Sequence, residues 1–138
     1  MDTSFLSRKE EEQKMQKSGR LPPGQSLTQK FQILHYGNIP AFDPARWTFH
    51  VTGEVVTPLE ISWDQFMRLP RRKLLMDIHC VTRWSKFDTE WEGVSVKDLL
   101  DQKIIQLKPG VKFVIEEAEF GYTTNLPLDV VLSENFLL

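Results

Sequence analysis

The sequence predicts an α+β domain in which short helices accompany a mixed β-sheet. Segments with strand and helix patterns follow one another without the regular long spacing of βαβ units. The 138 residues are 41% hydrophobic, which is enough apolar material for one ordinary core. Residues 1–20 are mostly charged and polar, so we expect a flexible or loosely helical N-terminal arm there. The single domain is expected over residues 21–138, with its globular part beginning near Leu27.

The first elements are predicted from local patterns. The run LPPGQ at residues 21–25 forces an extended or turning backbone. In residues 47–52, hydrophobic and polar side chains alternate, which predicts a half-buried strand. Ser62 and Gln65 form a capping-box sequence, and the short helix that it starts must end before Pro70.

Three further elements are expected in the second half. Residues 74–81 form the next strand candidate, and Ser95 caps a helix that runs through Leu99 and Leu100. Residues 111–115 predict another strand. The chain stops at SENFLL, and we interpret these last residues as the start of a strand that is cut short, so that the fold is incomplete at its C-terminal end.

Composition excludes several classes of function. A net charge of -2 and a pI near 5.9 leave no broad cationic surface for nucleic acid. No apolar run approaches the roughly 18 residues of a membrane span, and no secretory signal begins the chain. One cysteine excludes an internal disulfide. We therefore expect a cytoplasmic protein.

That cysteine, Cys80, is open to two interpretations. In the predicted strand it follows the apolar residues Leu74, Met76 and Ile78 on one face, and free cysteine is often buried, so an inert core thiol is favoured by composition alone. His79 points to the opposite face. However, Cys80 stands at the end of the strand, where reactive groups are often placed, and Arg83 or Lys86 nearby would favour a thiolate.

Three functional interpretations of a reactive Cys80 compete. A Cys-His nucleophile would need His35 or His50 to fold against it. A zinc site would need several of the three histidines, which show no zinc-ligand spacing. A cofactor metal that brings its other ligands with it needs only one protein thiolate, and one cysteine satisfies this requirement.

The run HCVTRWSKFDTEWEGVSVKDLL, residues 79–100, closely resembles the molybdenum-binding segment of the sulfite oxidase family, in particular its short bacterial members with an oxidoreductase molybdopterin-binding domain. The likeness continues through LPPGQ, FQILHYGNIP, WTFHVTGEVVTPLEISWDQFMRLP and GYTTNLPL. The positions that match the family pattern are Cys80, Thr82, Trp84, Trp91, Gly93, Val94, Leu99 and Leu100.

The resemblance implies a sulfite-oxidase-type molybdopterin-binding fold in which Cys80 supplies one sulfur to molybdenum. The other ligands would be the two dithiolene sulfurs of the pterin and oxygens, and the chemistry would be two-electron oxygen-atom transfer. Further cofactor-binding positions implied in this way are Thr82, His35, Tyr36, Thr123, Thr124 and Asn125. Arg83 is a candidate for an anionic substrate or the cofactor phosphate, because a guanidinium grips oxyanions in a bidentate way.

Each of these residues also has a purely structural interpretation. His35 and Tyr36 would lie at the end of a strand and make ordinary structural hydrogen bonds. Residues 123–125 would form a turn before Pro127, and Arg83 would be a solvated side chain. Trp84 and Trp91 are expected to serve packing.

The sequence therefore predicts a molybdopterin-dependent oxidoreductase that acts on a small oxyanion, S-oxide or N-oxide. A separate electron-transfer partner is expected, because the chain has no haem-attachment or iron–sulfur cysteine set. The alternative is a non-catalytic binding or interaction domain that kept the scaffold and lost the cofactor. We also expect that the 138-residue chain alone is inactive, binds the cofactor weakly or not at all, and self-associates through residues 132–138.

Overall fold

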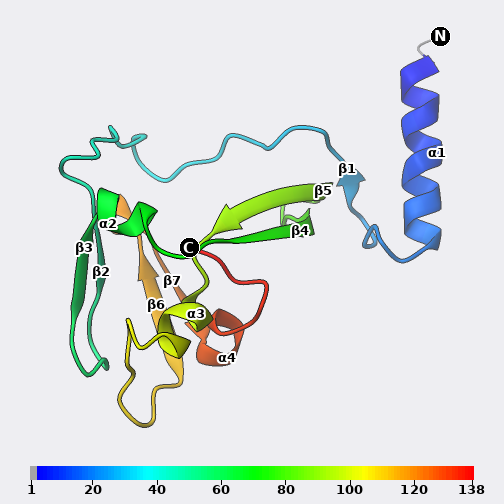
Figure 1. Cartoon of the computed structure of the whole chain (residues 1–138). Coiled ribbons are helices and arrows are strands. Elements are labelled where there is room, and N and C mark those ends of the chain that lie inside the picture. Colours follow the sequence, from blue (N-terminus) through cyan, green and yellow to red (C-terminus); the bar gives the residue numbers. More distant parts are fainter. Residues whose placement is uncertain (1–2) are drawn as a thin grey trace. The chain divides into compact units, whose positions relative to one another are not determined.

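The computed structural model describes residues 3–138, with side chains from Arg8 onward. The chain forms two compact units, one of Met1–Ile33 with Leu74–Trp91 and one of Leu34–Lys73 with Glu92–Leu138. The elements in chain order (Figure 1) are α1 (Thr3–Lys17), β1 (Ser26–Leu27), β2 (Thr48–Val51), β3 (Leu59–Ser62), α2 (Trp63–Met67), β4 (Arg72–His79), β5 (Trp84–Gly93), α3 (Val96–Asp101), β6 (Phe113–Glu117), the 3₁₀ turn η1 (Glu119–Gly121), β7 (Thr123–Pro127) and α4 (Leu128–Val131).

The first unit is built on a three-stranded sheet in the order β1-β5-β4. Figure 1 shows the short β1 beside the beginning of the long β5. The two strands are parallel, with Ser26 opposite Trp84 and Leu27 opposite Ser85. The predicted strand at residues 74–81 is β4, which begins two residues earlier and ends at His79. Cys80 therefore lies just beyond the strand, in the connection to β5.

Helix α1 contributes polar groups to the free edge of β1. The Leu27 N–H donates to the Glu12 carboxylate at 2.8 Å, and the Leu27 carbonyl accepts from the Arg8 guanidinium. Unpaired backbone groups at a sheet edge are thus satisfied by side chains. The segment that was expected to be flexible or loosely helical is a helix in this structure, and its mobility stays a prediction. Leu21 is buried, so apolar packing begins ahead of Leu27.

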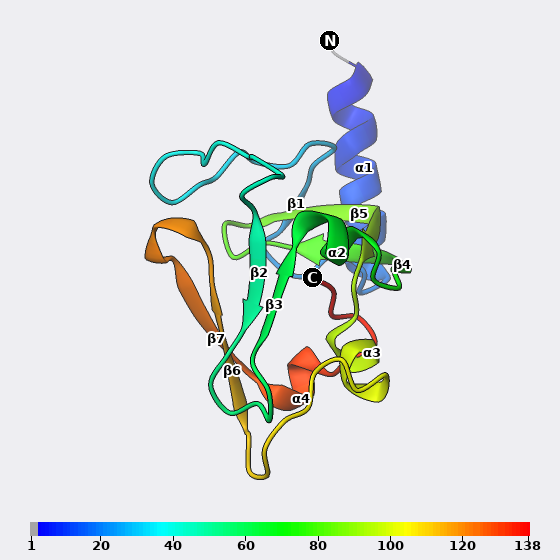
Figure 2. The same cartoon turned by 60° about the vertical axis from the view of Figure 1, so that its left-hand side comes forward.

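The second unit contains two antiparallel hairpins, β2–β3 and β6–β7, which Figure 2 shows as two pairs of adjacent strands. The alternation predicted for residues 47–52 is confirmed in β2, where Phe49 and Val51 are half-buried and Thr48 and His50 are exposed. The strand predicted at residues 111–115 is also present as β6, shifted to Phe113–Glu117.

Both predicted helix caps are confirmed. Before α2, the Ser62 hydroxyl accepts from the Gln65 N–H, and the Gln65 side chain accepts from the Ser62 N–H, which completes the capping box. Before α3, the Ser95 hydroxyl accepts from the Asp98 N–H at 3.4 Å. Each cap satisfies donors that a short helix otherwise leaves without partners. The expected end of α2 before Pro70 is also observed.

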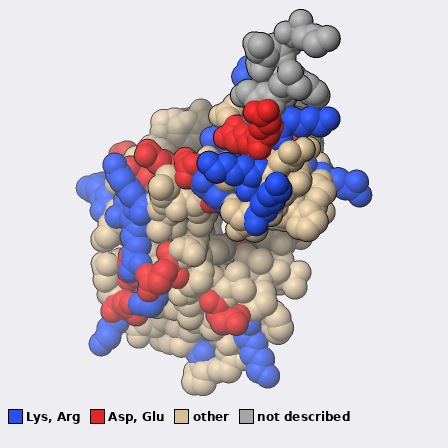
Figure 3. Space-filling model, turned by 90° about the vertical axis from the view of Figure 1, so that its right-hand side faces the viewer, with Lys and Arg blue, Asp and Glu red and all other residues tan. Residues whose placement is uncertain are grey.

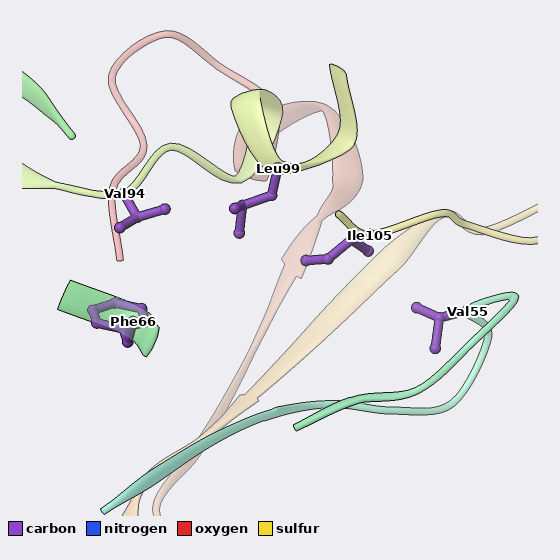
Figure 4. Close-up of a cluster of buried hydrophobic side chains, with 5 residues drawn as sticks. All are labelled: Val55, Phe66, Val94, Leu99 and Ile105. Atoms are coloured by element: carbon purple, nitrogen blue, oxygen red, sulfur yellow. The ribbon is translucent and has the colours of Figure 1, made fainter. Parts of the chain in front are cut away.

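The core of the second unit combines residues from segments that are distant in sequence. Figure 4 shows this cluster, which consists of Val55, Phe66, Val94, Leu99 and Ile105. Phe66 comes from α2 and Leu99 from α3. The two capped helices therefore place their buried side chains in one apolar cluster, whose burial stabilises the unit.

The predicted α+β class is confirmed. Among residues 3–138, parallel and antiparallel pairs both occur, and they are distributed over three small sheets. The turn considered for residues 123–125 is wrong, because these residues form β7. Asn125 pairs with Ile115 and Thr123 pairs with Glu117 of β6. The polar side chains of residues 123–125 remain exposed on this strand.

The last residues contact the segment that follows β5. Val94 and Leu138 exchange two backbone hydrogen bonds, of 3.0 and 2.9 Å, and Leu138 packs against the apolar core cluster. Residues 136–138 are half-buried and lie outside the helices and strands of the described chain, so the strand that was expected to start here is not observed. Gly93 permits this close approach, because a Cβ at this position would clash with the Leu138 carbonyl and lie 2.9 Å from Leu137 Cβ.

On the surface, Lys and Arg side chains lie among Asp and Glu side chains on the face drawn in Figure 3, without a large field of one sign. Within residues 3–138, no helix is both long and apolar enough to cross a membrane.

We predict that Gly93→Ala destabilises the protein by about 1–3 kcal/mol, because the added methyl group forces the terminal segment away from Val94. Urea denaturation of the two proteins measures the change. Gly110→Ala is the control, since a Cβ at Gly110 has no neighbour within 4 Å and only its positive φ of 89° opposes the substitution. A smaller loss for Gly93→Ala than for Gly110→Ala would contradict this explanation.

Candidate functional site

Cys80 lies in the tight connection between β4 and β5. The Cys80 N–H donates to the Trp84 carbonyl at 2.9 Å, and the Arg83 N–H donates to the Cys80 carbonyl at 3.0 Å. Residues 80–83 therefore form a hydrogen-bonded turn. The side chain of Cys80 is half-buried and forms no disulfide. The inert core thiol is not what the structure shows, because the cysteine lies in a turn and keeps part of its surface exposed.

The thiol group of Cys80 accepts a hydrogen bond from the Thr82 hydroxyl, with 3.2 Å between Oγ1 and Sγ. This bond, followed by weaker contributions from the backbone N–H groups of Thr82 and Val81, lowers the pKa of the Cys80 thiol below its ordinary value. The cause is that donors favour the negatively charged form. The local structure thus favours a thiolate, the form that binds metals or attacks electrophiles.

Arg83 adopts a left-handed backbone conformation with a φ of 68°. This region is unfavourable for residues other than glycine, and such strain is concentrated at functional sites. Its side chain is exposed. The Arg83 carbonyl accepts from the Ser26 N–H at 3.1 Å, so β1 contributes to the geometry of the turn.

A series of side-chain hydrogen bonds lies behind the turn. The Gln25 amide N–H donates to the Cys80 carbonyl at 2.9 Å, and the Gln25 amide oxygen accepts from the Ser85 hydroxyl at 3.2 Å. The Ser85 oxygen in turn lies 2.8 Å from His79 Nδ1. Ser85 is completely buried, so its hydroxyl depends on these protein partners.

An ion-pair network lies on the same sheet. Arg20 donates two hydrogen bonds to the Asp77 carboxylate, at 2.7 and 2.8 Å, and a third to Asp88 at 2.6 Å. The guanidinium also lies 4.3 Å from the centre of the Phe87 ring. Arg20 lowers the pKa of Asp77 to about 2. This network joins the N-terminal segment to β4, three residues before Cys80.

Trp84 and Trp91, which were expected to have a packing role, both contact Phe31. Its ring centroid lies 6.0 Å from those of Trp84 and Trp91, with edge-to-face geometry in each case. The indole N–H of Trp84 is buried and has no hydrogen-bond partner within the described part of the chain. Lys86 covers the Phe31 ring, with Nζ 5.0 Å from its centre.

The other predicted cofactor residues belong to the second unit. His35 and Tyr36 lie in a segment without helix or strand, so the expected strand-end pair is wrong. His35 Nδ1 donates to the Gly37 carbonyl at 2.8 Å, since a carbonyl only accepts. The Tyr36 ring lies 5.5 Å from that of Tyr122, which immediately precedes β7. Both tyrosines are more than half exposed.

The structure therefore collects the predicted residues into two groups. Cys80, Thr82 and Arg83 form one turn in the first unit. In the second unit, the Tyr36 ring contacts Tyr122, which immediately precedes Thr123, Thr124 and Asn125. Sequence reasoning missed Gln25 and Ser85, although LPPGQ placed Gln25 next to a predicted turn and Ser85 stood in the matched family segment.

The donor chemistry fits a metal that arrives with most of its own ligands. Cys80 provides one soft sulfur donor whose thiolate is favoured, in a turn that leaves it accessible. Among residues 3–138, no group of three or more His, Cys, Asp or Glu side chains is arranged to hold a metal ion. The zinc alternative thus finds no ligand set in that part of the chain.

The fold and the site define an α+β protein with one accessible thiol at a strand connection. Residues 36–138 match the model of the oxidoreductase molybdopterin-binding domain family. The chain is also 42% identical over 122 residues to the uncharacterized oxidoreductase YuiH of Bacillus subtilis (strain 168). The aligned part is 88% of this chain but 61% of that relative. The chain therefore belongs to the oxidoreductase molybdopterin-binding domain family.

We predict that Thr82→Val raises the pKa of the Cys80 thiol, because it removes the hydroxyl donor that contributes most to the lowering. The rate of iodoacetamide alkylation between pH 6 and 10 measures this directly, since the chain has one cysteine. The midpoint should move upward in Thr82→Val and stay unchanged in Thr52→Val, a control at an exposed threonine. Equal midpoints in Thr82→Val and the wild type would contradict the assigned hydrogen bond.

We also predict that Arg20→Met lowers stability at pH 7 and flattens its dependence on pH between about 4 and 2. The pKa of Asp77 is lowered from 3.8 to about 2, so its contribution is complete above pH 4 and is lost as the pH falls through 2. Urea denaturation at several pH values is the measurement. Arg46→Met serves as the control, because Arg46 is exposed and no ion pair of Arg46 occurs among the described residues. An unchanged slope in Arg20→Met would show that Asp77 does not depend on Arg20.

Proposed function

We propose that this chain is the cofactor-binding part of a molybdenum-dependent oxidoreductase of sulfite oxidase type, with Cys80 as the protein ligand of the metal. The observation that supports this most directly is the accessible, thiolate-favouring Cys80 in a hydrogen-bonded turn, within a chain of the oxidoreductase molybdopterin-binding domain family. When bound, molybdenum–molybdopterin supplies two-electron oxygen-atom transfer.

The residues of the first unit have distinct roles in this proposal. Cys80 provides its sulfur, and the Thr82 hydroxyl favours the thiolate form of that sulfur through the bond of 3.2 Å. The exposed guanidinium of Arg83 attracts an anionic group, either the substrate or the phosphate of the cofactor. The strained backbone at Arg83 limits the freedom of the turn and so fixes the direction of the thiol.

His35, Tyr36, Thr123, Thr124 and Asn125 are proposed to contact the organic part of the cofactor. Their support is the family resemblance, together with exposed polar and aromatic groups in the second unit. Exposed hydroxyl and amide groups on β7 provide donors and acceptors for the pterin and its phosphate.

The activity of the whole protein is part of the same proposal, because the chain spans about three fifths of the relative's length. The substrate is a small oxyanion, S-oxide or N-oxide, and a separate protein or domain accepts or supplies electrons. A cytoplasmic location and self-association through residues 132–138 stay predictions from the sequence, and light scattering tests the second.

We predict that Cys80→Ser in the natural gene product reduces bound molybdenum to background and abolishes turnover, while the melting temperature changes little. A serine hydroxyl is similar in size but is a hard, weakly acidic ligand. Elemental analysis of protein purified from cells that make the cofactor provides the measurement.

The matched control is Cys80→Ser combined with Ser133→Cys, which keeps the number of thiols but places the sulfur elsewhere on the surface. This double variant should also lack molybdenum. A wild-type molybdenum content in Cys80→Ser would contradict the assignment of Cys80 as the metal ligand. A wild-type protein without molybdenum would favour the non-catalytic binding domain.

A further inference from the structure

Gln25 connects the LPPGQ segment to the turn of Cys80 across 55 residues of sequence. Its placement has a local cause: the Gln25 N–H donates to the Pro22 carbonyl at 3.2 Å, and Gly24 takes a φ of 76° that closes the turn. Directly afterwards, Ser26 pairs with Trp84 in the sheet. The backbone of Gln25 is therefore fixed on one side by the turn from Pro22 and on the other by the pairing of Ser26, which limits where its side-chain amide can lie.

The direction of each hydrogen bond in this series follows from chemistry. The Cys80 carbonyl only accepts, so it must face the NH₂ group of Gln25, and the amide oxygen then faces Ser85. Because the Ser85 hydroxyl donates its proton to Gln25, its oxygen accepts from His79 Nδ1–H. The polar series is thus completely ordered, from His79 through Ser85 and Gln25 to the Cys80 carbonyl.

The Cys80 carbonyl receives two donors, the Arg83 N–H and the Gln25 amide. The bond from the Arg83 N–H closes the turn, and the bond from Gln25 connects the turn to a residue outside it. Arg83 is in an unfavourable backbone conformation, so contacts from outside the turn, by Gln25 and Ser26, help to maintain it. Residues that hold a metal ligand in place from behind contribute strongly to metal affinity.

We propose that Gln25 is a positioning residue for the metal ligand: it fixes the turn of residues 80–83 so that the Cys80 sulfur is presented in one orientation. The role toward the metal rests on the proposed function, whereas the hydrogen-bonded support of the turn does not. Ser85 acts through Gln25, because its hydroxyl orients the amide and has no access to solvent.

Two variants of Gln25 test this role. Gln25→Met has a similar shape and loses both hydrogen bonds, whereas Gln25→Glu keeps an acceptor for Ser85 and loses the donor to Cys80. The same two substitutions at Gln29, which is exposed and follows β1, are the matched controls. Melting curves establish that each variant is folded, and Gln25→Glu carries the test if Gln25→Met does not fold.

The first measurement is amide hydrogen exchange of Cys80 and Arg83 in the cofactor-free chain. Both Gln25 variants should accelerate exchange about fivefold, roughly the factor that one ordinary hydrogen bond provides, with no change in the Gln29 variants. Unchanged exchange in the Gln25 variants would overturn the support of the turn. Wild-type exchange in Gln25→Glu alone would also overturn it, because the bond to Cys80 would then carry no weight.

The second measurement is the molybdenum retained by the natural gene product after dialysis. Loss of the support should weaken metal binding by about tenfold, as for other residues that orient a ligand. Faster exchange with unchanged molybdenum would show that Gln25 is structural only, and would overturn its role toward the metal. If the wild type itself holds no molybdenum, the proposed function fails, while the exchange result still decides the support of the turn.

Discussion

The pairing of β1 with β5 is the contact on which the arrangement around Cys80 depends. Ser26 donates its N–H to the Arg83 carbonyl, and Thr28 donates to the Ser85 carbonyl at 2.9 Å. These bonds join parts of the chain that are almost 60 residues apart, which costs loop-closure entropy. The burial of Leu27 at this pair offsets part of that cost. The pairing places the segment LPPGQ beside the turn of residues 80–83, where Gln25 donates to the Cys80 carbonyl.

In the second unit, the equivalent constraint is the contact between Val94 and Leu138. The glycine of the family pattern has a physical reason here, because Gly93 lies where the terminal segment crosses the backbone. Val94 is completely buried directly after it and joins Phe66 and Leu99 in the core. The pattern Trp-x-Gly-Val thus combines an exposed aromatic residue, a close backbone approach and a core residue within four positions.

The chemistry of the site depends on a balance between burial and exposure at one thiol. A fully buried cysteine would have a raised pKa and no access for a metal, and a fully exposed one would have no fixed orientation. Cys80 lies between these limits. Hydrogen bonds from Thr82 favour its charged form, while the turn and Gln25 restrict its movement. A single protein ligand is sufficient for a cofactor that brings its remaining ligands.

Much of the local structure could be predicted from the sequence, because its causes lie within a few residues. The strand β2 follows from the alternation of Phe49 and Val51 with polar neighbours, and the caps of α2 and α3 follow from Ser62 and Ser95. The family could also be predicted from the sequence, because the motifs that resemble it are short and local. The boundaries of β4 and β6 were less accurate, since strand ends depend on their partners.

Contacts between distant segments could be decided only by the tertiary structure. No local pattern states that Gln25 reaches Cys80, that Arg20 reaches Asp77, or that Thr123 begins a strand opposite Glu117. A glutamine or an arginine has the same local preferences wherever its partner lies, so its role is fixed by the packing of the chain. The sequence by itself determined the class, the caps and the identity of the thiol, because these depend on residue type and spacing. The tertiary structure decided what supports that thiol, because hydrogen bonds across 55 residues exist only after the strands have paired.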